Sequence, residues 1–218
     1  MPKAWRMARS WLLRVLSVLN VQNNLHSHTI IHTITHTIIP IPTGGATRRS
    51  MILKFNGKSP QIAESAYISP AATIIGDVEI GEKANIWPGA VVRGDLAKIT
   101  IGSYASIEDN CVIHSPLDIS IGDNVIVGHG AVIHCRKIGD NVLIGNNATI
   151  LDDVEIGDFC VIGSGALVAP GTKVPERSMA MGVPARVKGQ VSEEHVTYIV
   201  EAAKFNYNLA LKYKQQGL

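Results

Sequence analysis

The chain has 218 residues, of which 46% are hydrophobic and only 5% aromatic, and it contains 20 glycines. This length suffices for one substantial domain, and so few aromatic residues mean that small and β-branched side chains must fill the core. Six of the 20 basic residues and none of the 18 acidic ones lie in residues 1–50, so residues 51–218 carry 14 basic and 18 acidic residues, a net charge of −4. That charge argues against binding to nucleic acid. Three cysteines, an odd number, indicate a reducing compartment rather than a disulfide framework.

Residues 1–50 show no repeat, and we predict that they form an unstructured extension of the folded domain. Their arginine-rich, acid-free composition is typical of an organellar transit peptide and also of a start site placed too far upstream, and we favour a true start at Met51. The apolar stretch Trp11–Leu19 is interrupted by Arg14, so it suits neither a signal peptide nor a membrane span. We therefore predict a cytoplasmic protein that does not enter a membrane, with organellar import if residues 1–50 are a genuine transit peptide.

From Ile62 onward, an aliphatic residue recurs every six positions. The period resumes at Ile101 after an insertion of three residues, at Ile121 after two extra residues, and at Ile138 after a deletion of one residue. The residue four positions after each aliphatic one is almost always small, so both positions should face the core. Six residues make one short strand and one turn, and three such units close a triangular coil, with coils stacked about 4.8 Å apart. The sequence therefore predicts an all-β fold, a parallel β-helix over residues 51–186.

Beyond the repeat, the spacing of apolar residues becomes that of a helix. Ser192 is a candidate N-cap, and Glu193 and Glu194 suit the first turn because negative charge is stabilised at a helix N-terminus. Within residues 187–218 we expect one C-terminal α-helix from about Glu193 to Lys214, with its apolar face along the β-helix.

Three histidines, His114, His129 and His134, fall in one 21-residue window of the repeat. His114 and His134 each follow the inward aliphatic residue of the third unit in their coil, so the two rings should stack on one edge. His129 follows the second unit and should lie on a different edge. Three neutral imidazoles and one open position are the typical ligand set of catalytic zinc. One ion can join all three only if copies of the chain associate about a threefold axis, so that edges of neighbouring copies meet.

The motifs that carry these histidines resemble those of γ-class carbonic anhydrases, a family of hexapeptide-repeat proteins. They are R-G-D at Arg93–Asp95, E-D-N-C-V-I-H at Glu108–His114 and V-G-H-G-A-V-I-H at Val127–His134. The resemblance covers about residues 60–186. It implies a left-handed β-helix and a homotrimer whose zinc takes two histidines from one subunit and the third from the next.

The same resemblance implies the residues of the site. The implied metal ligands are His114, His129 and His134. Residues at the positions of Arg93, Asp95 and Asp109 line the site in this family. The repeat phase also stacks Arg93 below His114 and Asp109 below His129, so we expect an ion pair between Arg93 and Asp109 across the subunit interface.

This chain departs from the family pattern close to the expected metal. Glu108 stands where the family usually has glutamine, and Ser106 stands where it usually has asparagine. A carboxylate can accept a proton but cannot donate a hydrogen bond as an amide does, so Glu108 is a candidate base. The acidic loop that moves protons in the archetypal enzymes is also missing, because only residues 115–118 occupy its place.

The function implied is the reversible hydration of CO₂ to bicarbonate. Zn²⁺ bound by three neutral imidazoles lowers the pKa of its water to about 7 and supplies hydroxide at neutral pH. Fe²⁺ could use the same ligands. Two alternatives remain: an acyltransferase, since such enzymes share the repeat, and a non-catalytic assembly subunit.

The cysteines are expected to be structural. Cys111 and Cys160 occupy the inward small position of the repeat, where a thiol behaves as a small hydrophobic group. Cys135 follows His134 and is expected to point outward. We do not expect it to bind the metal, because a fourth ligand would close the open position.

Overall fold

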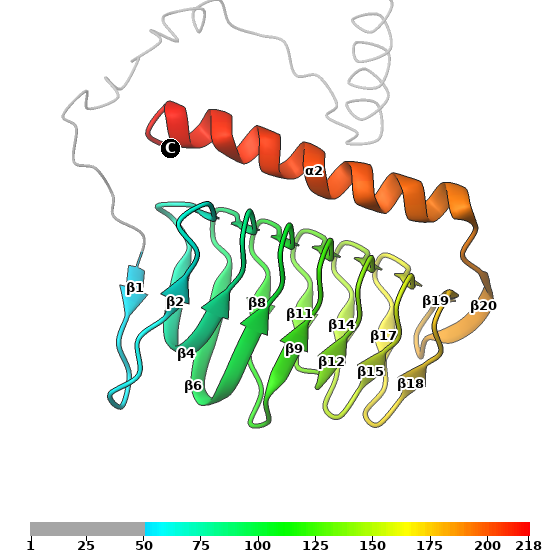
Figure 1. Cartoon of the computed structure of the whole chain (residues 1–218). Helices are drawn as coiled ribbons and strands as arrows, with labels where there is room; N and C mark the ends of the chain where they lie inside the picture. The colour runs from blue at the N-terminus through cyan, green and yellow to red at the C-terminus, as the bar shows by residue number, and fades with distance from the viewer. Residues whose placement is uncertain (1–50) are drawn as a thin grey trace, which may run out of the picture. The chain divides into compact units, whose positions relative to one another are not determined.

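A computed structural model describes residues 51–218, and the predicted extension at residues 1–50 lies outside the described residues. The described chain forms the predicted parallel β-helix, followed by one helix, α2 (Glu193–Gln215), which runs back along the stack of coils (Figure 1). Ser192 caps this helix by accepting a hydrogen bond from the backbone N–H of His195, so the predicted start is confirmed. Within residues 51–218, no helix has the length and hydropathy needed to cross a bilayer.

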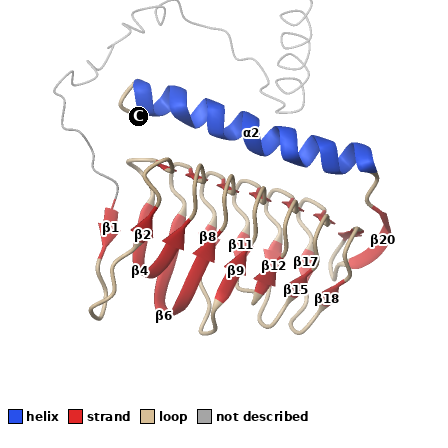
Figure 2. Cartoon of the chain, in the orientation of Figure 1, coloured by secondary structure: helices blue, strands red, loops and turns tan. Residues whose placement is uncertain are grey.

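The coils present three faces built from short parallel strands (Figure 2). The face that we call the uncharged face contains β1 (Met51–Leu53), β8 (Val112–Ile113), β11 (Val132–Ile133), β14 (Thr149–Ile150) and β17 (Leu167–Val168). The charged face contains β2 (Gln61–Ile62), β9 (Ile119–Ile121), β12 (Lys137–Ile138), β15 (Glu155–Ile156) and β18 (Lys173–Val174). Two longer strands bend around the edge between these faces and belong to both, β4 (Thr73–Ile80) and β6 (Val91–Ile101).

The third face lies under α2, and we call it the helix-covered face. Its strands are β3 (Tyr67–Ile68), β5 (Asn85–Ile86), β7 (Ser106–Ile107), β10 (Ile126–Val127), β13 (Leu143–Ile144), β16 (Val161–Ile162) and β19 (Ser178–Met181). The repeat ends where β19 pairs with β20 (Arg186–Gln190), because that pairing is antiparallel and stops the winding of the coil. The chain then crosses to α2, which packs on β3, β5 and β7.

The core is the stack of residues that the six-residue period places inward. From Ile74 to Val174 each period-six aliphatic side chain is buried, and the small residue four positions later is buried in nearly every unit. A β-branched side chain is stiff and packs well on the pleated surface of a sheet, so successive coils stack isoleucine upon isoleucine. The pattern of the sequence therefore fixes the core without aromatic residues.

One expectation about the core is wrong, since Cys135 is fully buried instead of pointing outward. The backbone stays extended past Ile133, where His134 donates its N–H to Ile150 and Arg136 donates to Val154 of the next coil. Side chains alternate along an extended segment, so Ile133 and Cys135 point inward and His134 points outward. The repeat is one residue shorter between Ile133 and Ile138, so the six-residue period did not define the direction of the side chain at position 135.

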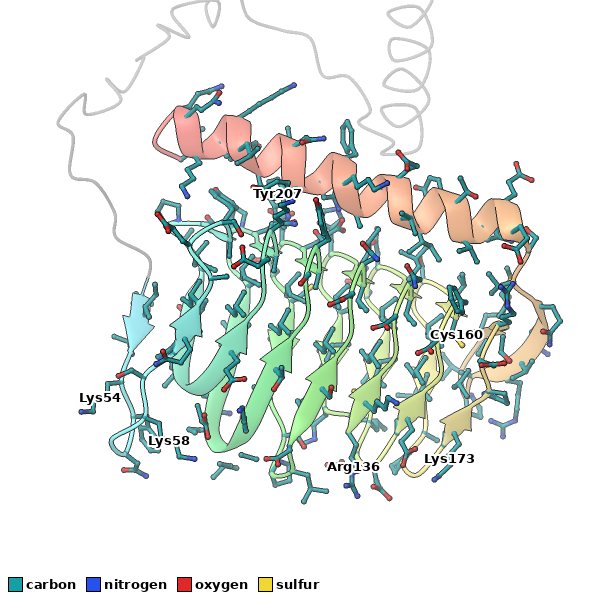
Figure 3. All side chains as sticks on the ribbon, viewed as in Figure 1. Lys54, Lys58, Arg136, Cys160, Lys173 and Tyr207 are labelled. Carbon is teal, nitrogen blue, oxygen red and sulfur yellow. The ribbon has the colours of Figure 1, made fainter. Side chains whose placement is uncertain are left out.

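The outward-facing residues give the faces different chemical characters. On the uncharged face they are, in register, Thr73, Val91, Val112, Val132, Thr149 and Leu167. On the charged face they are Gln61, Glu79, Thr100, Ser120, Lys137, Glu155 and Lys173. Arg136 and Lys173 project from this charged side (Figure 3). Lys173 and Glu155 on the charged face form an ion pair at 3.3 Å, whereas the outward residues named for the uncharged face carry no charge. On that face Val112 and Val132 are 38% and 37% exposed.

Candidate metal centre

Two predicted ligands, His114 and His134, stack on the edge between the uncharged and charged faces. His114 follows β8 and His134 follows β11, and these strands pair with Ile113 opposite Ile133. The ring centroids are 5.6 Å apart, and the side chains are 15% and 29% exposed. The predicted stacking of the two rings is confirmed.

Arg93 and Asp95 lie one coil below His114 on the same edge, because Val92 pairs opposite Ile113. Arg93 donates to Asp95 at 2.5 Å, and Asp95 Oδ1 lies 3.0 Å from His114 Nε2. Burial alone would raise the pKa of Asp95, but the hydrogen bonds from Arg93 and His114 and the charge of Arg93 outweigh it, so this pKa lies below its ordinary value. Asp95 is therefore ionised at neutral pH and can orient the His114 ring.

The glycine of the R-G-D motif is required by a close approach of two strands. A side chain at Gly94 would collide with the backbone carbonyl of Asp77 on β4. Glycine lets β6 bend around the edge against β4 at this point. The bend is what carries Arg93 and Asp95 to the edge that bears His114.

A carboxylate that the sequence analysis did not single out contacts His134. Asp152, in the turn after β14, places Oδ1 2.8 Å from His134 Nδ1. The coil is 17 residues long here, with Ile133 opposite Ile150, so the register places Asp152 one position beyond the residue level with His134. That register is the signal that could have identified it.

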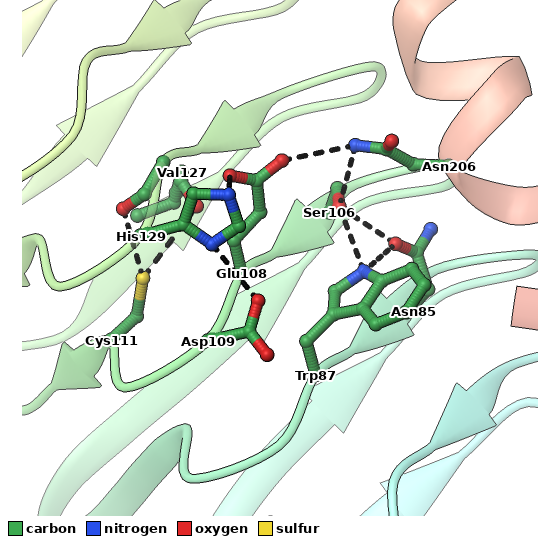
Figure 4. Close-up of polar contacts among 10 residues, drawn as sticks. Asn85, Trp87, Ser106, Glu108, Asp109, Cys111, Val127, His129 and Asn206 are labelled. Atoms are coloured by element: carbon green, nitrogen blue, oxygen red, sulfur yellow. Dashed lines mark hydrogen bonds and ion pairs between the residues drawn. The ribbon is translucent and has the colours of Figure 1, made fainter. Parts of the chain in front are cut away.

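His129 lies on the other edge of the uncharged face, in the turn between β10 and β11. Its Nδ1 is 2.9 Å from Asp109 Oδ2, and its Nε2 is 3.1 Å from Glu108 Oε2 (Figure 4). The predicted stacking of Asp109 below His129 is confirmed. The His129 side chain is 57% exposed. The three histidines therefore occupy two separate edges of the β-helix. Within residues 51–218 of one chain, no three histidine, cysteine or acidic side chains come together as a metal-binding group.

Glu108 is held from its other side by a polar network under α2 (Figure 4). Asn206 of α2 donates from Nδ2 to Glu108 Oε1 at 3.2 Å and to Ser106 Oγ at 3.1 Å. Ser106 also donates to Asn85 Oδ1 at 2.7 Å, and Trp87 Nε1 donates to the same oxygen at 2.6 Å. Sequence analysis missed Asn206, because the six-residue period does not determine how the helix is rotated on the coils.

The remaining predicted residues lie as follows. Within one chain Arg93 pairs with Asp95 and Asp109 contacts His129, so the pairing of Arg93 with Asp109 across an interface stays a prediction.

The Cys111 thiol donates to the Gly128 carbonyl at 3.1 Å in the core. Burial raises the pKa of Cys111 to about 11 and that of Cys135 to about 12, so both remain neutral thiols at neutral pH.

Comparisons with known proteins identify a family model and several relatives of this chain. A family model, Bacterial transferase hexapeptide (six repeats), matches residues 59–94 and 137–170. Gamma carbonic anhydrase 2, mitochondrial, of Arabidopsis thaliana is 36% identical over 172 residues, which are 75% of this chain and 62% of the plant protein, so the chain spans less than two thirds of that relative. The carbonic anhydrase of Geobacillus kaustophilus is 45% identical over 148 residues, which are 67% of this chain and 81% of that protein.

Among solved structures, the hexapeptide transferase family protein from Anaplasma phagocytophilum matches with a TM-score of 0.72 and 33% identity. The match covers 75% of this chain and 98% of that chain. The repeat, the three motif histidines and these relatives lead to one assignment. The chain belongs to the γ-class carbonic anhydrase-like family of hexapeptide-repeat proteins.

Proposed function

We propose that this protein hydrates CO₂ reversibly to bicarbonate at metal sites that form between copies of the chain in a homotrimer. Each site would take His114 and His134 from one copy and His129 from the next. The observation that carries the proposal is that these histidines occupy the two opposite edges of a single uncharged face. A threefold arrangement that packs such faces together would bring unlike edges of neighbouring copies side by side.

The chemistry of the faces supports this mode of association. An association that covers the uncharged face removes the half-exposed Val112 and Val132 from water, which is favourable, and desolvates no charged side chain of that outward row. Burying the charged face would instead desolvate pairs such as Lys98 with Glu79, which costs free energy. The uncharged face is therefore the better candidate for the contact between copies.

The donor set fits a divalent ion such as Zn²⁺, with Fe²⁺ as the alternative. Three imidazole nitrogens and no thiolate suit either ion. Each histidine also contacts a carboxylate: His114 contacts Asp95, His134 contacts Asp152, and His129 contacts Asp109. Such contacts orient imidazole ligands and increase their basicity. A metal held there supplies the Lewis acidity that makes water nucleophilic at neutral pH.

Two residues of the chain then have roles in the reaction. Glu108, fixed between Asn206 and His129, would accept the proton that hydration releases, since a carboxylate side chain can act as a general base. Arg93, held by Asp95 on the edge that bears His114, would attract and orient the bicarbonate anion through its fixed positive charge.

Metal analysis of purified protein tests the proposal. We expect close to one Zn²⁺ or Fe²⁺ per chain, and we expect His129→Ala to lose it as fully as His114→Ala, because each site needs both edges. His195→Ala, which changes a histidine at the start of α2, is the matched control and should keep the metal. A metal-free trimer would contradict the proposal.

CO₂ hydration by the metallated trimer, followed by stopped flow, tests the activity itself. No hydration above background with either metal would favour one of the two alternatives. Acyl transfer from acyl-coenzyme A would then identify an acyltransferase, and the lack of both activities would indicate an assembly subunit.

A further inference from the structure

We propose that Asp152 is a positioning residue for the metal site, which holds the imidazole of His134 with Nε2 free to bind the ion. This inference rests on the proposed function, because it assigns a role toward the metal proposed there. Asp152 itself would not touch the ion.

Backbone pairing brings the two residues together. Strands β11 and β14 are neighbours with Ile133 opposite Ile150, and the His134 N–H donates to the Ile150 carbonyl at 2.9 Å. Asp152 follows Ile150 by two positions, in the turn that ends this stretch of the coil. The contact between Asp152 Oδ1 and His134 Nδ1, at 2.8 Å, is therefore built on a fixed backbone.

The contact determines which ring nitrogen carries the proton. A carboxylate only accepts, so the neutral His134 ring must donate from Nδ1, which leaves the lone pair on Nε2. Among the described residues, no carboxylate pairs with His134 Nε2, whereas His129 contacts a carboxylate through each nitrogen. His134 therefore keeps Nε2 for an ion, whereas His114 meets its carboxylate through Nε2 and keeps Nδ1.

The contact contributes little to the stability of the fold. The Asp152 side chain is 55% exposed, and exposed pairs of this kind typically contribute less than about 1 kcal/mol. Removal of the carboxylate should therefore leave the metal-free protein folded while the His134 ring loses its fixed orientation. Loss of such an outer partner typically weakens metal binding by about 10–100-fold.

The neighbouring Asp153 provides a matched control. It carries the same charge, is 60% exposed and contacts Arg136 at 3.5 Å instead of a histidine. Its backbone has a φ of +57°, a conformation that asparagine also tolerates, so Asp153→Asn removes one charge without new backbone strain.

The experiment measures the Kd for Zn²⁺ of the metal-free, full-length protein by competition with a chelator, together with its melting temperature. We expect Asp152→Ala to weaken zinc binding by about 10–100-fold at an unchanged metal-free melting temperature, and Asp153→Asn to bind as the wild type does. Asp152→Asn should restore part of the affinity, because its amide oxygen accepts the same hydrogen bond.

A second readout follows the tautomer directly. Proton–nitrogen correlation spectra of histidine-labelled, metal-free protein should show His134 protonated at Nδ1 in the wild type and a mixed population in Asp152→Ala. If wild type binds zinc and Asp152→Ala binds it equally well, the role of Asp152 is refuted while the proposed function stands. If wild type itself binds no zinc, both are refuted.

Discussion

Asn206 on the C-terminal helix donates to Glu108 in the β-helix across 98 residues of sequence, at 3.2 Å. The second oxygen of Glu108 lies 3.1 Å from His129 Nε2, so one carboxylate joins the helix to a candidate metal ligand. The docked position of α2 therefore determines where Glu108 sits. In this protein the helix is part of the candidate site as well as a cover for the coils.

Replacing Asn206 by alanine should lower both stability and activity. The variant loses two hydrogen bonds and leaves Ser106 and Glu108 less well satisfied, which should cost about 1–2 kcal/mol in the free energy of unfolding. CO₂ hydration should slow because Glu108 is no longer fixed. Chemical denaturation and stopped-flow assays measure the two effects. Asn208→Ala, an exposed change on the same helix, should stay within about 0.5 kcal/mol of wild type, and equal effects from both variants would contradict the role of Asn206.

Replacing Glu108 by glutamine tests whether this residue accepts the proton or has no role in turnover. If Glu108 accepts the proton, Glu108→Gln should lower kcat and make the rate depend more strongly on buffer concentration. The effect on kcat/KM should be smaller, because CO₂ is attacked before the proton leaves. Glu201→Gln, a change at an exposed position on α2, removes the same charge and should change neither quantity. An unchanged or faster Glu108→Gln enzyme would refute the proton-acceptor role.

A charge on the uncharged face should disrupt the assembly. Val132 points outward between His129 and His134 in the chain, and lysine there would have to be desolvated in the proposed contact between copies. We expect Val132→Lys to shift the mass in solution from three copies of the 23.4 kDa chain toward one, with loss of bound metal. Ser120→Lys on the charged face is the control and should remain a trimer. Light scattering coupled to size exclusion measures the masses, and a trimeric Val132→Lys protein would rule out this face as the contact.

The sequence predicted the fold and the positions of the three histidines because both follow from one periodic rule. The six-residue period specifies for each residue its coil, its face and its direction, and this suffices to stack His114 with His134. It could not place Cys135, which lies at a deletion where the phase is lost. It could not identify Asn206 either, since a helix of 3.6 residues per turn has no fixed phase relative to the coils. Contacts between different kinds of element needed the structure.

A protein that begins at Met51 should fold as the whole chain does. The described β-helix starts with β1 (Met51–Leu53), and the core of the described residues runs from Ala66 to Ala185. We expect residues 51–218 to have the melting temperature and trimer mass of the full-length protein. Calorimetry and light scattering measure both, and a large drop in melting temperature would show that residues 1–50 pack on the domain.

The buried thiols should be unreactive and should make stability depend on alkaline pH. Burial raises the pKa of Cys135 from its usual 9.0 to about 12, so the native thiol stays neutral up to high pH while the unfolded thiol ionises above about pH 9. The unfolded state then binds fewer protons than the native state. The contribution of this group to stability is therefore fully present below pH 9 and is lost as the pH rises toward 12, by up to about 1.4 kcal/mol per pH unit.

Two measurements check this behaviour. An aromatic disulfide reagent should label Cys135 at pH 8 only after the protein unfolds. Cys135→Ala should lose less stability between pH 9 and 11 than the wild type, because it lacks the thiol that ionises in the unfolded state only. Other groups that titrate in this range are shared by both proteins and cancel in the difference. The alanine should also cost stability at pH 7, since it leaves a small void in the core. Rapid labelling of native Cys135, or identical slopes above pH 9, would show that this thiol is in contact with solvent.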